Sequence, residues 1–189
     1  MRHLTLFLVF ACLSLSPPLS AKQPIPPGKP FDYPSMAFYP DRWKKQGLDL
    51  PMVPWKGKHV TFVTTDPDRD PAIMGEFIQH LDDGWALYAD ITEATPHPHK
   101  KHEGQPTIVA IPANDLSSGY GCGYVGSTGI EMTHFYDGHY PNLKKNTRDV
   151  PHAYFYEMGR NYFTFGDRHS CFTTGFAVFM RYVCMHPCC

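Results

Sequence analysis

The chain has 189 residues, of which 42% are hydrophobic and 19% are charged, and its 18 acidic residues nearly balance its 17 basic ones. This composition is typical of a globular protein and excludes a disordered one. Because the sequence contains no long run of lysine and arginine, we expect no binding to the phosphate backbone of nucleic acid.

The only long apolar run covers residues 4–15, directly after Arg2 and His3. It is too short for a membrane span, which requires about 20 apolar residues. Small residues follow at 19–21, so the pattern predicts a secretory signal peptide over 1–21. We therefore expect a secreted, extracellular protein without a membrane span.

Cysteine usage fits an exported chain, because five cysteines remain after the predicted signal peptide. We expect at least two disulfides, while the odd cysteine stays free or joins a second chain in a disulfide-linked dimer. A helix between Cys171 and Cys184 would hold them about 20 Å apart, too far for a bridge between these two. The five are Cys122, Cys171, Cys184, Cys188 and Cys189.

Residues 22–57 form a segment rich in proline and aromatic residues. The prolines predict an extended arm without helix and with few backbone hydrogen bonds. So many aromatic rings are unusual in a free linker, so we expect the arm to lie against the domain and bury some of them.

A single domain is expected over 58–189, with a small sheet. Runs of β-branched and aromatic residues predict short strands at 59–63, 107–111 and 130–135. A glycine-rich stretch at 117–129 precedes the third strand and would allow the backbone to approach a ligand or a neighbouring helix closely.

Helices are predicted in three places. Asp70 and Pro71 form an N-terminal cap before apolar residues that recur every three or four positions up to Tyr88. After a turn-rich connection at 137–149, a second helix is expected over 151–163. The last helix is expected to start after Thr173 and to bury Phe176, Phe179, Met180 and Val183 on one face. The order of elements predicts an α+β (α/β-like) fold.

The segment 156–163, Tyr-Glu-Met-Gly-Arg-Asn-Tyr-Phe, carries the most specific pattern in the chain. It resembles the H-E-x-G-H-N-F helix of gluzincin-type zinc metallopeptidases, the group that includes the basic secretory and M60-like secreted peptidases. In that HExxH motif two histidines one turn apart bind zinc, and the glutamate activates a metal-bound water. Here Tyr156 and Arg160 occupy the histidine positions, and Glu157 keeps its place.

The resemblance extends to a second short stretch, Thr-Gly-Phe-Ala at 174–177. In the family an E-G-[FLI]-A stretch on a following helix supplies the third zinc ligand, a glutamate, and Thr174 stands at its position. The order of elements is similar over 58–185, which implies a zincin-like domain ending in a pair of helices. Family members commonly continue with a helical subdomain, so the resemblance implies a chain truncated at its C-terminus.

The substitutions at the three ligand positions remove the chemistry of a zinc site. A phenol, a guanidinium and a hydroxyl provide no thiolate, imidazole or carboxylate, so we expect no zinc and no other cofactor. Glu157 and Arg160 lie three residues apart on the predicted helix, where they can form an ion pair. A vacated zinc site would bring Tyr156, Arg160 and Thr174 together, with Glu157 beside them.

Three other patterns suggest sites with less specificity. His97, His99 and His102 offer imidazoles to a transition metal, although the simpler interpretation is a polar surface loop. Asp66, Asp68 and Asp70 have the spacing that opens a calcium loop, but prolines interrupt it and Phe77 stands where the closing glutamate is needed. Cys122 or Cys171 could act as a nucleophile beside His134 or His169, with disulfide bonding as the alternative.

Three functional hypotheses follow. The first is a catalytically inactive metallopeptidase-like protein that binds an extracellular protein, peptide or glycan, or serves as a scaffold. The second is a metal-free hydrolase with Glu157 as the base, or a histidine such as His152 or His169, and Arg160 as the stabilising cation. The third is a disulfide-linked structural module. The first two differ in whether Glu157 and Arg160 face an open cleft.

Overall fold

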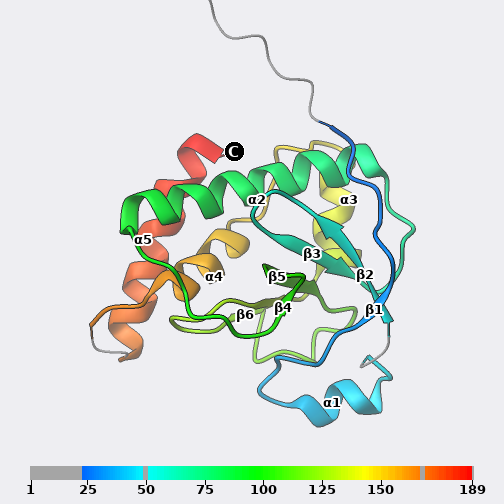
Figure 1. The fold of residues 1–189 in the computed structure, drawn as a ribbon, viewed down its shortest axis with the longest axis horizontal. Coiled ribbons are helices and arrows are strands. Elements are labelled where there is room, and N and C mark those ends of the chain that lie inside the picture. The colour runs from blue at the N-terminus through cyan, green and yellow to red at the C-terminus, as the bar shows by residue number, and fades with distance from the viewer. Residues whose placement is uncertain (1–22, 49–50, 167–168, 189) are drawn as a thin grey trace, which may run out of the picture.

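The computed structural model describes residues 23–48, 51–166 and 169–188. Helices and a mixed sheet make up the fold, so the predicted α+β class is confirmed (Figure 1). The predicted signal peptide at 1–21 lies outside the described residues.

The sheet has the strand order β1-β2-β3-β5-β7-β6, and β4 pairs with β5. Strands β3, β5 and β7 run parallel to one another, while the remaining pairs are antiparallel. The strands are β1 (Phe31–Asp32), β2 (Pro51–Lys56), β3 (Thr61–Thr64), β4 (Lys101–His102), β5 (Gln105–Ala110), β6 (Gly121–Gly123) and β7 (Ile130–Met132).

The longest helix begins where the sequence predicts. The Asp70 carboxylate accepts hydrogen bonds from the backbone N–H groups of Ala72 and Ile73, and Pro71 is the first helical residue. The helices are α1 (Pro40–Lys45), α2 (Pro71–Thr92), α3 (Tyr140–Leu143), α4 (His152–Tyr162) and α5 (Ser170–Cys188), with a π-helical turn η1 (Phe135–His139) before α3.

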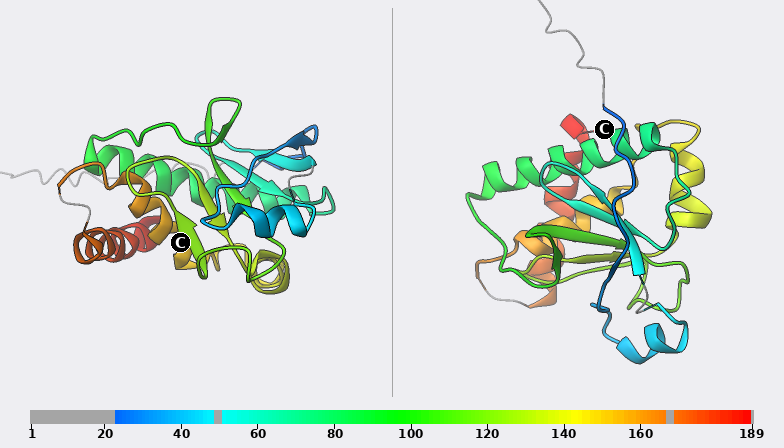
Figure 2. Two further views of the ribbon diagram at one scale, coloured as in Figure 1. Left: turned by 90° about the horizontal axis from the view of Figure 1, so that it is seen from below. Right: turned by 45° about the vertical axis from the view of Figure 1, so that its right-hand side comes forward.

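Each face of the sheet is covered by a different part of the chain. Because side chains alternate along a strand, Phe62 on β3 packs into a core with α2 and α4, whereas the next residue, Val63, packs into a second core. That second core contains residues from the N-terminal segment and α1, including Tyr33 and Trp43. Figure 2 shows α2 and α1 on opposite sides of the strands.

A buried aspartate fixes the β2–β3 turn to α2. Asp82 is 4% exposed, and its carboxylate accepts hydrogen bonds from the backbone N–H groups of Lys58, His59 and Val60 at 2.6, 2.8 and 2.9 Å. A buried carboxylate requires such donors to offset its desolvation. This interaction determines where β3 begins relative to α2.

The prediction of a helix-free extended arm over 22–57 is wrong. Pro40 stands in the first turn of α1, where its missing N–H costs no hydrogen bond. Pro54 lies inside β2, opposite Val63, and its carbonyl accepts a hydrogen bond from Gly28. The segment therefore adds two strands to the sheet, and it buries Tyr33, Trp43 and Trp55 as expected.

The predicted buried face of the last helix is correct at Met180 and wrong at Phe179, and Phe176 and Val183 are half-buried. Helix α5 begins at Ser170, and Phe179 is 64% exposed. The other buried residues of this helix are Thr173, Ala177 and Cys184, which were not predicted. The cause lies in α4, where a Cβ added to Gly159 would lie 2.9 Å from the Cα of Ala177. The two helices approach too closely for a large side chain at this point, and Phe179 lies on the exposed side of α5.

The connection predicted at 137–149 is partly helical. His134 adopts a left-handed conformation with φ 59°, after which the chain forms the turn η1 and the short helix α3. The strand predicted over 130–135 ends at Met132, and Phe135 instead begins η1. Phe135 and, in the predicted connection, Leu143 are fully buried in the core. The turn-forming residues around Leu143 are the reason that the sequence did not indicate its burial.

Candidate functional site

Helix α4 directs Glu157 and Arg160 at the edge strand β6. Glu157 Oε2 accepts a hydrogen bond from the backbone N–H of Gly123 at 2.7 Å, and Arg160 Nε donates to the Gly123 carbonyl at 3.2 Å. Arg160 Nε lies 3.8 Å from Glu157 Oε2, so the expected ion pair is present. Together the two side chains bind both backbone polar groups of one residue.

Gly123 is the residue that makes this contact possible. It lies opposite Ile130 of β7 in an antiparallel ladder, where pairs that exchange both hydrogen bonds alternate with pairs that exchange none. Because α4 binds both the N–H and the carbonyl of Gly123, the pair of Gly123 and Ile130 exchanges no backbone hydrogen bonds. A Cβ added at this position would lie 2.6 Å from the Glu157 carbonyl oxygen. Helix α4 thus covers the outer edge of β6 at Gly123.

Asn161 and the end of α4 hold the residues that follow β6. Asn161 is fully buried, and its Nδ2 donates to the carbonyls of Tyr124 and Gly129 at 3.0 and 3.2 Å. The Arg160 carbonyl accepts a hydrogen bond from Gly126 at 3.0 Å. We refer to Glu157, Arg160 and Asn161 as the α4 clamp, because all three bind the backbone of residues 123–129.

The carboxyl of Glu157 has an unusual acidity. Burial raises its pKa from 4.5 to about 7, while Arg160 and the Gly123 N–H partly offset this shift. A carboxyl with a pKa near neutrality can exchange protons in catalysis. However, Glu157 is only 6% exposed and its Oε2 is bound to Gly123, so the group lies beneath the edge strand and not in an open cleft.

The structure unites two of the four predicted site residues. Tyr156 and Thr174 are half-buried on α4 and α5. Over residues 23–48, 51–166 and 169–188, no hydrogen bond or ion pair connects Tyr156 or Thr174 to Arg160, whose guanidinium is directed to β6. The convergence of Tyr156, Arg160 and Thr174 stays a prediction.

The three histidines of the 97–102 loop have separate environments. The His99 ring packs on Tyr124 at 4.1 Å between ring centroids, and the His102 ring packs on Phe31 at 4.0 Å. His97 forms a backbone bridge with Ser127. Among the described residues, no group of three or more His, Cys, Asp or Glu side chains is arranged to hold a metal ion.

The three described cysteine side chains form no disulfide with one another. Cys122 and Cys184 are buried and Cys171 is exposed. The side chains of Cys188 and Cys189 lie outside the described part, so the expected disulfides stay a prediction. Burial raises the pKa of Cys122 to about 11, which disfavours the thiolate that cysteine catalysis requires.

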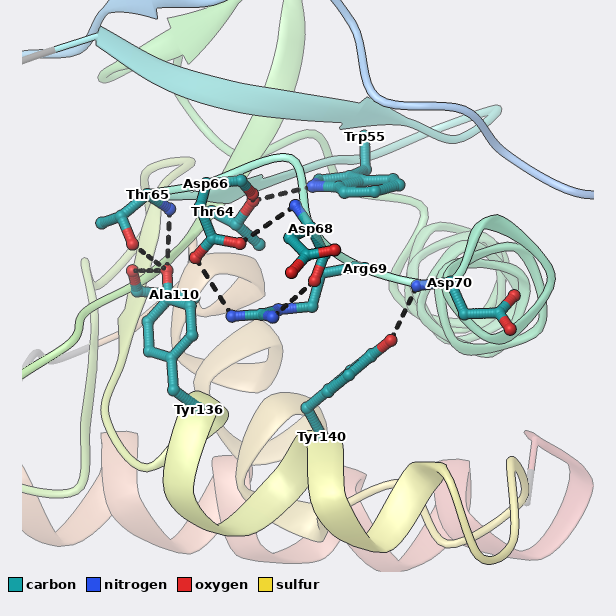
Figure 3. Close-up of polar contacts among 10 residues, drawn as sticks. All are labelled: Trp55, Thr64, Thr65, Asp66, Asp68, Arg69, Asp70, Ala110, Tyr136 and Tyr140. Carbon is teal, nitrogen blue, oxygen red and sulfur yellow. Dashed lines mark hydrogen bonds and ion pairs between the residues drawn. The ribbon is translucent and has the colours of Figure 1, made fainter.

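The aspartates at 66–70 build a structural loop. Asp66 pairs with Arg69 at 3.1 Å, and Asp70 caps α2, so these carboxylates have separate tasks (Figure 3). The Arg69 guanidinium packs on the rings of Tyr136 and Tyr140 at 5.2 and 5.0 Å from their centroids. The spacing that resembles a calcium loop therefore has a structural explanation.

Two tyrosines from η1 and α3 hold this loop in place. The Tyr136 hydroxyl accepts a hydrogen bond from the Thr65 N–H at 2.8 Å and donates to the Ala110 carbonyl at 3.2 Å. The Tyr140 hydroxyl accepts from the Asp70 N–H at 2.7 Å (Figure 3). Neither residue was predicted, because Tyr140 lies in the expected turn-rich connection and Tyr136 directly precedes it.

A second buried carboxyl, Glu131 on β7, was also missed as a polar anchor. It is fully buried, and its Oε1 accepts a hydrogen bond from the Met36 N–H at 2.6 Å. Burial raises its pKa to about 8. Strand alternation in Ile130-Glu131-Met132 was the available signal, since it directs Glu131 to the face opposite α2. Glu131 thereby ties the N-terminal segment to the sheet.

The histidines near the motif have mixed surroundings. His139 lies between the hydroxyls of Tyr154 and Tyr120, at 3.0 and 3.1 Å, and burial lowers its pKa to about 4. The His134 ring stacks on Tyr120 at 4.7 Å. His152, weighed above as a base, is exposed, and its Nδ1 lies 3.3 Å from Arg181 Nη1.

A separate cavity of about 370 Å³ lies beside the end of α2. Its walls include Trp85, Tyr162 and two lysines, Lys58 and Lys101. The motif contributes Tyr162 to this cavity, whereas the Glu157 carboxylate faces β6. The cavity and the α4 clamp are therefore different places in the molecule.

Comparison with protein-family models, with curated proteins and with solved structures found no match to this chain. No helix in the described ranges is both long enough and apolar enough to cross a membrane.

Proposed function

We propose that this chain is a secreted, catalytically inactive metallopeptidase-like protein that acts as an extracellular binding or scaffold module. The observation that carries this proposal is the α4 clamp. A glutamate that activates water must present its carboxylate to that water, whereas Glu157 presents Oε2 to the Gly123 N–H at 2.7 Å.

The residues at the inferred ligand positions do not fit zinc. Tyr156 and Thr174 carry neutral hydroxyls, and Arg160 carries a fixed positive charge that would repel a dication. The guanidinium instead lies 3.8 Å from Glu157 and 3.2 Å from the atom it binds on Gly123. The positive charge beside Glu157 thus comes from the Arg160 guanidinium, which also binds the backbone of β6.

The contacts of Glu157 and Arg160 with β6 support a structural role for the motif. The function that we propose for the chain is therefore binding or scaffolding. An extracellular protein, a peptide or a glycan is the expected class of partner.

Restoring the ligand set tests the resemblance. The triple variant Tyr156→His, Arg160→His and Thr174→Glu should bind one zinc ion per chain after dialysis, whereas the unaltered protein should hold less than a tenth of one. Zinc is measured by elemental analysis, and circular dichroism confirms that the variant is folded. Stoichiometric zinc in the unaltered protein, or none in the folded variant, would refute the proposal.

A metal-free hydrolase is the second candidate, and one observation favours it. The pKa of Glu157 is raised to about 7, in the range that suits a general base at neutral pH. Under this alternative, Glu157→Gln abolishes hydrolysis of peptides or esters while the fold is retained. Under the first proposal, no hydrolysis depends on Glu157.

A further inference from the structure

The outer face of α5 exposes large aromatic side chains. Phe172, Phe179 and Tyr182 are 58%, 64% and 63% exposed, although such rings are commonly buried. Gly175 is exposed between them, and a Cβ added there would meet nothing within 4 Å. We refer to Phe172, Gly175, Phe179 and Tyr182 as the outer face of α5. Figure 2 shows this helix at the periphery of the molecule.

The four positions follow the spacing of a coiled-coil seam. Their separations of three, four and three residues place them in one stripe along the helix. The buried residues Thr173, Ala177, Met180 and Cys184 form another stripe, which packs on α4 and α2. At about 100° per residue the two stripes lie on nearly opposite sides of α5, so one is covered and the other is free for a partner.

We propose that the outer face of α5 binds the outer face of a second copy of this chain in an antiparallel pair. A twofold axis at residue 177 would bring Phe179 of each copy over Gly175 of the other, because these positions are equally distant from the axis. Phe172 and Tyr182 are likewise equidistant from residue 177, so Phe172 of each copy would stack on Tyr182 of the other. The spacing of large and small residues is therefore complementary to itself, as an isologous dimer requires.

The charge of α5 also favours a second copy. Arg181 is the only Asp, Glu, Lys or Arg residue among 170–188. In the antiparallel arrangement the two Arg181 residues lie about 12 Å apart along the helix axes, at opposite ends of the contact. Depletion of charge in the centre of a contact, with aromatic enrichment, is typical of protein interfaces.

The size of the stripe sets the expected strength. Rings of this kind cover about 150–250 Å² each, so their exposed parts supply about 350 Å² per copy. The pair would bury less aromatic surface than the roughly 1,200 Å² of a stable complex, and neighbouring residues must supply the rest. We therefore expect a weak, reversible dimer that forms at micromolar concentrations.

This dimer differs from one joined by a disulfide. Cys171 is exposed at the beginning of α5, six residues from the proposed axis. The two Cys171 residues would be separated by about 18 Å along the helices, far beyond the 7 Å limit for a bridge. The inference is also independent of the proposed function, since it uses none of the α4 clamp.

Sedimentation equilibrium of the full chain under reducing conditions tests the proposal. The unaltered protein should show a concentration-dependent dimer. Phe179→Arg should be monomeric, and Gly175→Leu should weaken the dimer at least tenfold because the new side chain fills the space for Phe179. Phe38→Arg is the matched control: Phe38 is 58% exposed but lies outside α5, so its dimer should be unchanged.

The combined variant Gly175→Phe with Phe179→Ala tests the register, because it exchanges the large and small positions and should restore the dimer lost in Gly175→Leu. Circular dichroism confirms that each variant is folded. An unaltered protein that stays monomeric up to 200 μM would overturn the proposal. So would a dimer that Phe179→Arg leaves intact, or one that disappears on reduction.

Discussion

Helices α4 and α5 pack against each other, yet they differ in which side chains they bury. Helix α4 buries a carboxylate and an amide, Glu157 and Asn161, and uses them to bind the backbone of residues 123–129. Helix α5 buries small residues such as Ala177 and exposes Phe179. Helix α4 thus directs polar groups into the molecule, whereas α5 exposes three of its large aromatic side chains to solvent, Phe172, Phe179 and Tyr182.

The difference shows where chemistry and binding are expected. On α4, Glu157, Arg160 and Asn161 are all engaged in hydrogen bonds to the backbone of residues 123–129, which supports the structural role that we propose for them. The exposed rings of α5 contribute nothing visible to the core, and contiguous apolar surface of this kind indicates an interaction. The site suggested by the sequence motif and the site suggested by the surface therefore lie on different helices.

The largest effect is expected where the two helices touch. Gly159→Leu should lower the free energy of unfolding by about 3 kcal/mol, because even a Cβ at this position would lie 2.9 Å from the Cα of Ala177. Gly175→Leu is the matched change on α5 and should cause no loss, since space is open there. Urea unfolding at low protein concentration measures both. Equal losses would contradict the assigned packing.

Removal of the cation from the α4 clamp should have the next largest effect. Arg160→Met leaves Glu157 without its charge partner and Gly123 without one donor, which should cost about 1–3 kcal/mol. Arg148→Met, at an exposed position, should cost less than 0.5 kcal/mol. The same unfolding measurement applies, and similar values for the two variants would show that the clamp contributes little.

The acidity of Glu157 predicts a pH dependence. Between its usual pKa of 4.5 and about 7, the folded protein holds a proton on Glu157 that the unfolded chain releases. Stability therefore falls as pH rises through this window, by up to about 1.4 kcal/mol per pH unit. Glu157→Gln lacks this contribution.

The free energy of unfolding of Glu157→Gln, relative to the unaltered protein, should therefore rise with pH in this window and level off above pH 7. Unfolding curves at one-unit steps of pH measure the difference, in which the other titrating groups cancel. A difference that falls with pH, or that does not change, would be incompatible with a buried Glu157 carboxyl.

The smallest effect compares alanine at two glycines. Gly175→Ala should stabilise the protein by about 0.5–1 kcal/mol, because alanine favours helix and nothing within 4 Å opposes the new Cβ. Gly159→Ala should destabilise it. Thermal unfolding of both variants tests this opposite sign. A stabilising change at Gly159 would place the contact between α4 and α5 elsewhere.

Features set by residues adjacent in the sequence were predicted better than features set by contacts between distant segments. The start of α2 could be predicted because Asp70 and Pro71 act on the adjacent turn. The inner stripe of α5 could be predicted only at Met180, because apolar residues lie all around this helix and the close approach at Gly159 selects which side is buried. The same holds for β2, since a strand with Pro54 is acceptable only because of its neighbours.

The candidate site was predicted in part for the same reason. The ion pair of Glu157 and Arg160 follows from their spacing on one helix, and it is confirmed. Their joint attachment to Gly123 depends on a strand more than thirty residues earlier in the chain, which no local pattern specifies. The buried Asn161 was visible in the motif, but its two carbonyl partners were not.

The central proposal is that Glu157 is a structural anchor and not a catalyst. Its most direct test is the hydrolysis of a mixed peptide library at pH 7, followed by mass spectrometry, for the unaltered protein and for Glu157→Gln. The account predicts that no cleavage product depends on Glu157. Products that the unaltered protein forms, and that the folded Glu157→Gln variant forms at least a hundredfold more slowly, would contradict it.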